Sequence, residues 1–296
     1  MNNVLHNFFI LLLMGCAGNT VQDHSPQSSE VKIVEGTYVN RPHFLIQTES
    51  ATYYYDRKGG GISRMIDREG KDWVAFGKEP WDEYPASAAS SFRGIPNLVF
   101  RSEDSGAGHP GHDQCQSKII GDTAILTTSL SERWQWKWTF HPSHAELEVL
   151  RVDPHHPYWF LYEGTPGGVF DPQHQYIGTD IGGPWDTAWD YYAGDILYGQ
   201  WRFVYLGHKQ VDRVLFISQQ DPDTLTDTFS YLGNSEKGNQ APNGMVVLGL
   251  GRAEGAKPLM QKPNVFTLGF IERKVENVEA HDSLKQQLKV LLSNKL

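Results

Sequence analysis

Two histidines in a glycine-rich segment offer the clearest acid–base chemistry in this chain of 296 residues. Residues 106–115 place three glycines and a proline around His109 and His112. Glycine lets a backbone approach a ligand closely, and an imidazole exchanges protons near neutral pH. We therefore expect His109 or His112 to act as a catalytic base or acid. Together with Asp113 they could instead ligate a metal, but this spacing specifies none. We therefore assign no metal or other cofactor, although the sequence does not exclude a divalent metal ion.

A second candidate lies where an aromatic run ends in a carboxylate and a flexible turn, at residues 158–168. Glu163 could act as an acid or base, or bind sugar hydroxyls. Tyr162 beside it is a plausible proton donor if its surroundings lower its pKa. The alternative is that the aromatic residues form core and that Glu163 belongs only to the turn.

A third candidate is the polar, bent segment of residues 91–97. Arg93 carries a planar fork of donors that matches a carboxylate, and Asn97 adds an amide donor. We expect both to bind substrate. The alternative for Arg93 is a structural role, in which it donates to loop carbonyls.

Aromatic side chains gather in a further irregular region. Trp185, Trp189 and Tyr198 are suited to stacking on the apolar face of a pyranose ring. Arg202 alternates with aromatic neighbours and could reach a carboxylate or sulfate. We expect these four residues to contribute to substrate binding, the alternative being aromatic packing under loops.

Composition indicates the scaffold that must position these groups. The chain has 9 Trp, 13 Tyr, 14 Phe, 29 Gly and 16 Pro, which is typical of a turn-rich β protein. The net charge of −9 argues against a nucleic-acid partner, because phosphate-backbone binding needs cations. A locally basic pocket for an anionic sugar remains compatible with it.

Hydrophobic patterning predicts about a dozen strands and one helix. Trp134, Trp136, Trp138 and Phe140 alternate with polar residues, which is the pattern of a strand with one buried face. The expected strands are residues 43–48, 51–55, 62–66, 72–76, 124–130, 133–140, 145–152, 158–162, 201–206, 213–218, 245–251 and 265–271. Leucines at helical spacing predict a C-terminal helix capped by Asp282 or Ser283. We predict an all-β fold, a large antiparallel β-sandwich with a short C-terminal helix, and one domain over 31–296.

The N-terminus predicts export. A short apolar run ends in Gly15-Cys16, which is similar to a bacterial lipoprotein signal. We expect residues 1–15 to be a signal peptide, Cys16 to carry lipid that anchors the protein to a membrane, and residues 16–30 to be a flexible tether. An outer-membrane or periplasmic location follows from this, with secretion as the alternative.

One stretch resembles a known family. Residues 59–67 read GGGISRMID, and a GKDW turn follows at 70–73. This arrangement of a glycine-rich turn, a strand and a second turn resembles the opening of galactose-mutarotase-like β-sandwiches. The resemblance implies a carbohydrate-active protein of the kind that includes sugar epimerases and domains of polysaccharide lyases and glycosidases. It transfers no catalytic residue.

The function that we predict is β-elimination from a uronic-acid-containing glycan, by cleavage or dehydration. Arg93 and Asn97 would neutralise the carboxylate, a histidine would abstract the C5 proton, and Tyr162 would protonate the leaving oxygen. One alternative is a sugar epimerase or glycosidase that uses Glu163 with a histidine or a second carboxylate. Another is a glycan-binding lipoprotein without catalytic activity.

Overall fold

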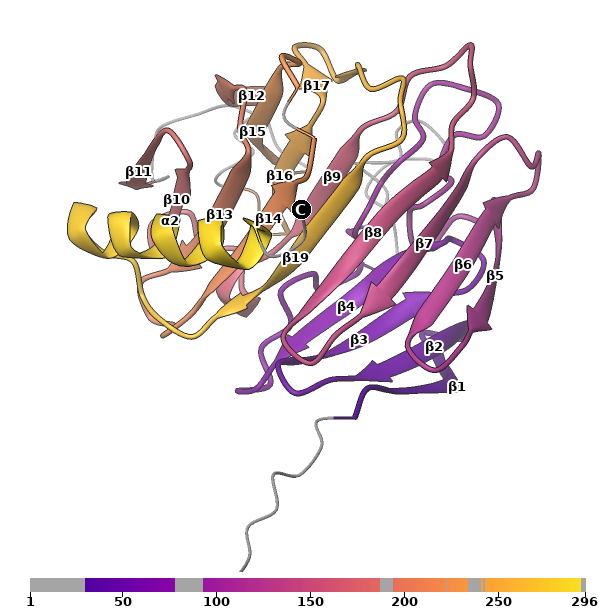
Figure 1. Ribbon diagram of the computed structural model, residues 1–296, viewed down its shortest axis with the longest axis horizontal. Helices are drawn as coiled ribbons and strands as arrows, with labels where there is room; N and C mark the ends of the chain where they lie inside the picture. The colour runs from indigo at the N-terminus through magenta and orange to yellow at the C-terminus, as the bar shows by residue number, and fades with distance from the viewer. Residues whose placement is uncertain are drawn as a thin grey trace, which may run out of the picture.

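The protein is described by a computed structural model covering residues 30–77, 93–186, 194–221, 223–233, 241 and 243–293. Within these residues the chain forms two β-layers packed face to face and one α-helix (Figure 1). The predicted all-β antiparallel sandwich with a C-terminal helix is confirmed.

One layer is a nine-stranded antiparallel sheet. In spatial order it contains β11 (Gly182–Asp186), β10 (Gln175–Thr179), β13 (Phe203–His208), β14 (Val214–Gln219), β19 (Val265–Ile271), β8 (His144–Arg151), β7 (Gln135–Phe140), β6 (Ala124–Ser129) and β5 (Cys115–Ile120).

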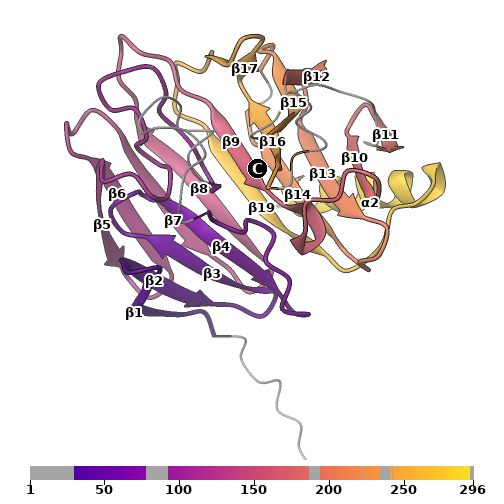
Figure 2. The same cartoon turned by 180° about the vertical axis from the view of Figure 1, so that it is seen from behind.

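The other layer, seen from behind in Figure 2, is built from two four-stranded sheets. The first contains β1 (Lys32–Tyr38), β2 (Arg41–Gln47), β3 (Ala51–Asp56) and β4 (Gly61–Asp67). The second contains β12 (Gly194–Gly199), β15 (Asp227–Leu232), β16 (Met245–Leu250) and β9 (Phe160–Gly164). Short elements complete the fold: η1 (Pro166–Gly168), β17 (Arg252–Ala253) and β18 (Lys257–Pro258).

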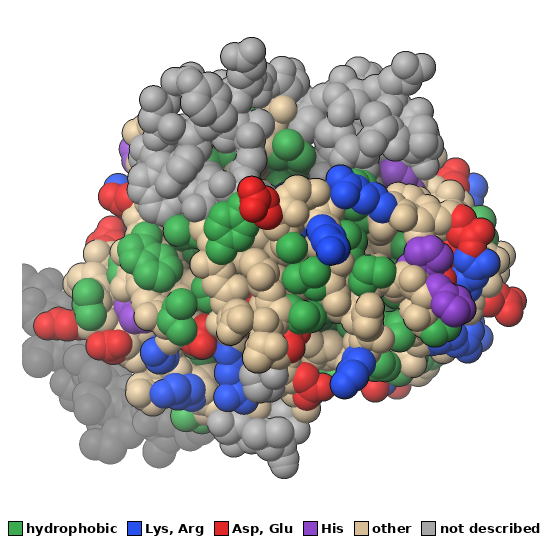
Figure 3. Space-filling view, turned by 90° about the horizontal axis from the view of Figure 1, so that it is seen from above, with side chains coloured by type: hydrophobic (Ala, Val, Ile, Leu, Met, Phe, Trp, Pro, Cys, Tyr) green, Lys and Arg blue, Asp and Glu red, His purple; other side chains and the backbone are tan. Residues whose placement is uncertain are grey.

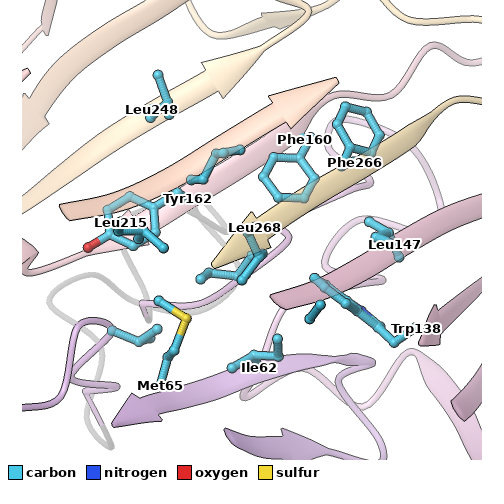
Figure 4. Packing of buried hydrophobic residues seen from close by; sticks show 14 of the residues in the cluster. Ile62, Met65, Trp138, Leu147, Phe160, Tyr162, Leu215, Leu248, Phe266 and Leu268 are labelled. Carbon is cyan, nitrogen blue, oxygen red and sulfur yellow. The ribbon is translucent and has the colours of Figure 1, made fainter. Parts of the chain in front are cut away.

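The core lies between the layers, and the tryptophan strand forms part of it (Figure 4). Trp134, Trp136 and Trp138 are all buried, which confirms the alternation predicted for β7. The Nε1–H of Trp136 donates to Tyr55 Oη and to the carbonyl of Gly60, at 3.2 Å each. Because Tyr55 belongs to β3, this ring ties the two layers together.

The helix α2 (Val278–Ser293) covers the outer face of the nine-stranded sheet beside β10, β13 and β14 (Figure 1). Leu284 and Leu288 are buried against that face, as the leucine spacing predicts. The expected cap is wrong. Asn277 caps the helix, because its Oδ1 accepts the N–H of Ala280 at 2.8 Å, whereas Asp282 and Ser283 lie inside the helix.

One expected strand is a turn. At residues 72–76 only Asp72 forms a bridge, to Ile66 of β4. Asp72 Oδ1 accepts the N–H groups of Val74 and Ala75, both at 3.1 Å, and Ala75 has a φ of 54°. The carboxylate therefore closes a local turn that competes with strand pairing. The sequence pattern did not predict six of the strands in the two layers, which are β1, β5, β10, β11, β12 and β15.

Among the described residues, no helix combines the length and the apolarity needed to span a bilayer. On the end of the sandwich that Figure 3 shows, acidic and basic side chains are interspersed with apolar ones.

Candidate functional site

The two four-stranded sheets meet at a seam made by two residues. Gly94 exchanges two backbone hydrogen bonds with Glu163 of β9, and Ile95 exchanges two with Ile62 of β4. The segment thus acts as a two-residue strand between β4 and β9. The same segment carries Arg93 and Asn97, so these two residues lie beside β9 although they are far from Glu163 in sequence.

Tyr162 and Glu163 point to opposite faces of this layer, because side chains alternate along a strand. Tyr162 lies in the core between the layers (Figure 4), and its hydroxyl donates to the carbonyl of Trp73 at 2.6 Å. Burial raises its pKa well above 10. The assignment of Tyr162 as proton donor is therefore corrected: it cannot contact a substrate held by Glu163.

Glu163 is hydrogen-bonded to His109. Glu163 Oε2 lies 2.7 Å from His109 Nε2, and both side chains are 0% exposed. His109 Nδ1 lies 2.8 Å from the carbonyl oxygen of Pro110, which can only accept, so Nδ1 carries a hydrogen. A second proton must lie between Nε2 and Oε2, because two lone pairs would repel at that distance. The pair is therefore neutral overall and shares a transferable proton.

Asn97 completes this group, and two acceptors in it lack partners. Its Nδ2 lies 3.4 Å from Glu163 Oε2. Glu163 Oε1 and Asn97 Oδ1 are buried and accept no hydrogen bond. Because a buried polar atom without a partner costs free energy, it requires an explanation. Both atoms are acceptors, so the missing partner is a donor such as a hydroxyl group.

His112 lies edge-on to His109, with ring centroids 5.3 Å apart. Burial, with smaller contributions from the nearby His109 and Arg41, lowers the pKa of His112 to about 3. Asp113 does not join the histidines as a metal ligand in this structure, because its carboxylate pairs with Arg41 Nη2 at 2.6 Å. Arg41 also pairs with buried Asp56 at 2.7 Å and so fixes the segment that carries both histidines.

The depressed pKa of His112 predicts acid sensitivity. The unfolded chain binds a proton at His112 near pH 6.5, whereas the folded chain binds it only near pH 3. Lowering the pH within this window therefore favours the unfolded state, by about 1.4 kcal/mol per pH unit from this group. Urea unfolding at several pH values should show a shallower loss of stability for His112→Gln than for wild type. The exposed His155, replaced by Gln, is the control; an unchanged slope for His112→Gln would contradict the prediction.

Arg93 is held by backbone carbonyls. Its Nη1 donates to Ala75 at 2.7 Å, and its Nη2 donates to Asn243 and Gly244 at 2.7 and 3.0 Å. Burial lowers its pKa, but the side chain remains a cation. The expected substrate-carboxylate contact is corrected, because both terminal nitrogens already serve segments distant in sequence.

This geometry predicts that Arg93→Lys destabilises the fold. One ammonium group cannot reach carbonyls on both sides of the guanidinium, so buried acceptors lose their donors. We expect a loss of about 1–3 kcal/mol in the free energy of unfolding, measured with urea. A fully stable variant that no longer binds an acidic sugar would restore the substrate-binding role.

The other expected binding residues lie at a distance from the proton pair. Trp185 is partly buried on β11, Tyr198 is 49% exposed on β12, and Arg202 is exposed before β13. β12 is three strands from β9, or about 14 Å at the usual spacing. One sugar ring cannot touch both Tyr198 and Glu163, although an oligosaccharide could. Trp189 and Cys16 lie outside the described residues.

A hollow of about 560 Å³ adjoins the histidine segment. Arg57 and Lys58 line it together with Asp113, and the remaining lining residues are Pro42, Cys115, Gln116, Ser117 and Leu130. Lys58 offers a cation to an acidic ligand, whereas Arg57 already pairs with Glu35 at 3.1 Å. No sequence pattern predicted this hollow or the Arg41–Asp56 pair, although an aspartate that ends a strand before three glycines is a recognisable turn signal.

Comparisons with known proteins concern the fold. No family model matches the chain, and no curated protein matches its sequence. Among solved structures, HI1317 superposes with a TM-score of 0.52 at 8% identity, covering 81% of this chain and 96% of its own. A proposed mutarotase, YeaD from Salmonella typhimurium, gives 0.49 at 9% identity, covering 82% and 94%. The heparan sulfate lyase HepC from Pedobacter heparinus gives 0.34 at 10% identity, covering 84% and 36%. The chain thus shares the β-sandwich fold of HI1317.

Proposed function

We propose that the protein is a carbohydrate-active enzyme in which the His109–Glu163 pair transfers protons to and from a sugar. The observation that carries this proposal is the shared proton beside two unpartnered acceptors, Glu163 Oε1 and Asn97 Oδ1. Sugar hydroxyls supply the donors that these atoms lack. Because both side chains are fully buried, substrate reaches them only when a covering segment moves.

The pair is sufficient for epimerisation at an anomeric carbon. With the proton on His109, His109 donates to the ring oxygen while the Glu163 carboxylate takes the proton of the anomeric hydroxyl. The C1–O5 bond breaks and a carbonyl forms. The reverse transfers close the ring on the other face, so protons and charges balance without a cofactor. This reaction needs no group that neutralises a substrate carboxylate.

Elimination from a uronic acid is the second candidate, supported by Lys58 in the hollow that Asp113 also lines. His109 removes the C5 proton, a C4–C5 double bond forms as the C4–O bond breaks, and His109 gives the proton to the leaving oxygen. The carboxylate must be neutralised for this step. Arg93 is committed elsewhere, so Asn97 and a protonated Glu163 would have to do so.

One experiment separates the candidates. Single anomers of neutral and acidic sugars are followed by NMR for anomer exchange, and uronic-acid oligosaccharides are followed by the ultraviolet absorbance of the new double bond. Faster anomer exchange without absorbance supports epimerisation, and rising absorbance supports elimination. If neither occurs while the sugars bind, the protein is a glycan-binding module.

The location inferred from the sequence is part of the same proposal. Export, with lipid on Cys16 and a tether over residues 16–30, would place the enzyme at a membrane surface where glycans arrive from outside.

A further inference from the structure

A second cluster of acid–base side chains lies on the hairpin between β7 and β8, apart from the seam. His141 and His144 flank the Pro142-Ser143 turn, and Glu146 follows on β8. One ligand atom from each of these three residues lies within 4.8 Å of the others. We propose that His141, His144 and Glu146 form a Zn²⁺ site.

The fold places all three side chains on one face. Phe140 and Ala145 pair across the hairpin and are buried in the core. Because side chains alternate along a strand, His144 and Glu146 point outward from β8. The ring of His141 stacks on that of His144, with centroids 4.4 Å apart, so it shares this outer face.

The separations between the ligand atoms are compatible with a metal ion. His144 Nε2 lies 3.5 Å from Glu146 Oε1, and His141 Nε2 lies 3.8 Å from Glu146 Oε2. These distances are at or beyond the limit of a hydrogen bond. Two ligands of a tetrahedral Zn²⁺ ion lie about 3.4 Å apart, given metal–ligand bonds of about 2.0–2.2 Å. The two rings are stacked at an interplanar angle of 16°, so at least one must turn out of the stack about its side-chain torsions before both lone pairs converge on one ion.

Neighbouring groups favour the ligating form of His144. Its Nδ1 lies 3.1 Å from Ser143 Oγ, a hydroxyl that can accept a hydrogen from Nδ1 in the tautomer that ligates through Nε2. Gly269 on β19 pairs with His144, and a Cβ at Gly269 would lie 3.0 Å from that of His144. The absence of a side chain there leaves room for the imidazole.

The hairpin is also anchored. The N–H of His141 donates to the carbonyl of His144 at 2.9 Å, and the N–H of Ser50 donates to the carbonyl of Pro142 at 3.0 Å. Ser50 precedes β3 in the opposite layer, so the turn is fixed to both layers. A bound ion would therefore cross-link a hairpin that is already formed. Three protein ligands leave the fourth position of a tetrahedral ion for water.

A similar cluster provides a matched control. Asp171, His174 and His208 also place three ligand atoms within 4.8 Å. Here Asp171 Oδ2 lies 2.6 Å from His174 Nδ1, an ordinary hydrogen bond. His208 Nδ1 accepts the N–H of Gln210 at 3.2 Å, so Nε2 carries the hydrogen and cannot ligate. In this cluster a proton joins Asp171 to His174, and the hydrogen on His208 Nε2 occupies the position that a metal would need.

The test is calorimetric titration of the full chain, without a histidine tag, with Zn²⁺. We expect saturable binding of one ion. Losing a residue that only hydrogen-bonds to a metal ligand typically weakens metal binding about 10–100-fold. His144→Ala and Glu146→Gln remove ligands, so each should weaken Zn²⁺ binding by more than this. His174→Ala should leave Zn²⁺ binding unchanged. The side chains of His144 and Glu146 are partly buried on the outer face of β8, and circular dichroism checks that the variants fold.

Cobalt and heat provide a second readout. Co²⁺ at the site should give the intense visible absorption of a tetrahedral ion, and Zn²⁺ should raise the melting temperature of wild type but not of His144→Ala. The proposal is overturned if wild type shows no saturable binding. It is equally overturned if His174→Ala abolishes binding while His144→Ala retains it.

Discussion

Glu163→Gln is expected to lower the turnover of the sugar substrate by about 10²–10⁴-fold, the usual contribution of a positioned acid–base group. Glutamine has nearly the same shape, so the contact with Asn97 can persist. An amide neither takes nor releases a proton, so the exchange with His109 stops. The measurement is the rate of anomer exchange, or of double-bond formation, per mole of folded protein.

Tyr162→Phe is the matched control, because Tyr162 is the neighbour of Glu163 on the other face of β9. Its loss removes one hydrogen bond to the carbonyl of Trp73, which still accepts the N–H of Thr165 at 3.0 Å. We expect turnover close to wild type. If Glu163→Gln keeps full turnover, or if Tyr162→Phe loses it, the proton-transfer assignment is wrong.

Trp136→Ala should cost about 3–5 kcal/mol of the free energy of unfolding. The ring is buried and joins β7 to β3, so its removal leaves a cavity and deprives Tyr55 Oη and the carbonyl of Gly60 of a donor. Gly60, at a φ of 77°, fits closely against this ring, because an added Cβ would lie 2.7 Å from Trp136 Cζ2. Urea unfolding followed by circular dichroism measures the loss.

Two further variants make this result interpretable. Trp136→Phe keeps most of the apolar volume and should lose less stability than Trp136→Ala. Leu130→Ala changes a side chain that is 54% exposed and should alter stability by less than about 0.5 kcal/mol. A Trp136→Ala protein as stable as Leu130→Ala would show that the ring does not belong to the core.

The fold was predictable where local pattern and tertiary environment agree. The tryptophan alternation of β7 reflects one buried and one exposed face, so its period identifies the strand. Residues 72–76 have the composition of a strand, but the Asp72 carboxylate binds its own backbone and makes a turn. The helix cap is similar, because Asn277 lies further upstream than the leucine spacing suggests.

The site was predictable in residue type more than in arrangement. Glycine-bent segments led to His109, Asn97 and Glu163, which the structure brings together. The partners of Arg93 include Asn243 and Gly244, about half the chain away, and no local pattern encodes that contact. Strand alternation alone, in contrast, shows that Tyr162 and Glu163 face opposite ways.

The seam also determines where the layer opens most easily. Among the described residues, Gly94 and Ile95 pair the two half-sheets through four backbone hydrogen bonds, those of Gly94 with Glu163 and of Ile95 with Ile62, whereas β3 and β16 are paired along their length. Local opening at this line breaks few bonds, so the amide hydrogens of Gly94 and Ile95 exchange with solvent before those of β3 or β16. Glu163 contributes both a backbone pair of the seam and the buried carboxylate. The same fluctuation that frees its amide hydrogen therefore loosens the cover over the shared proton, which couples hydrogen exchange at the seam to substrate access.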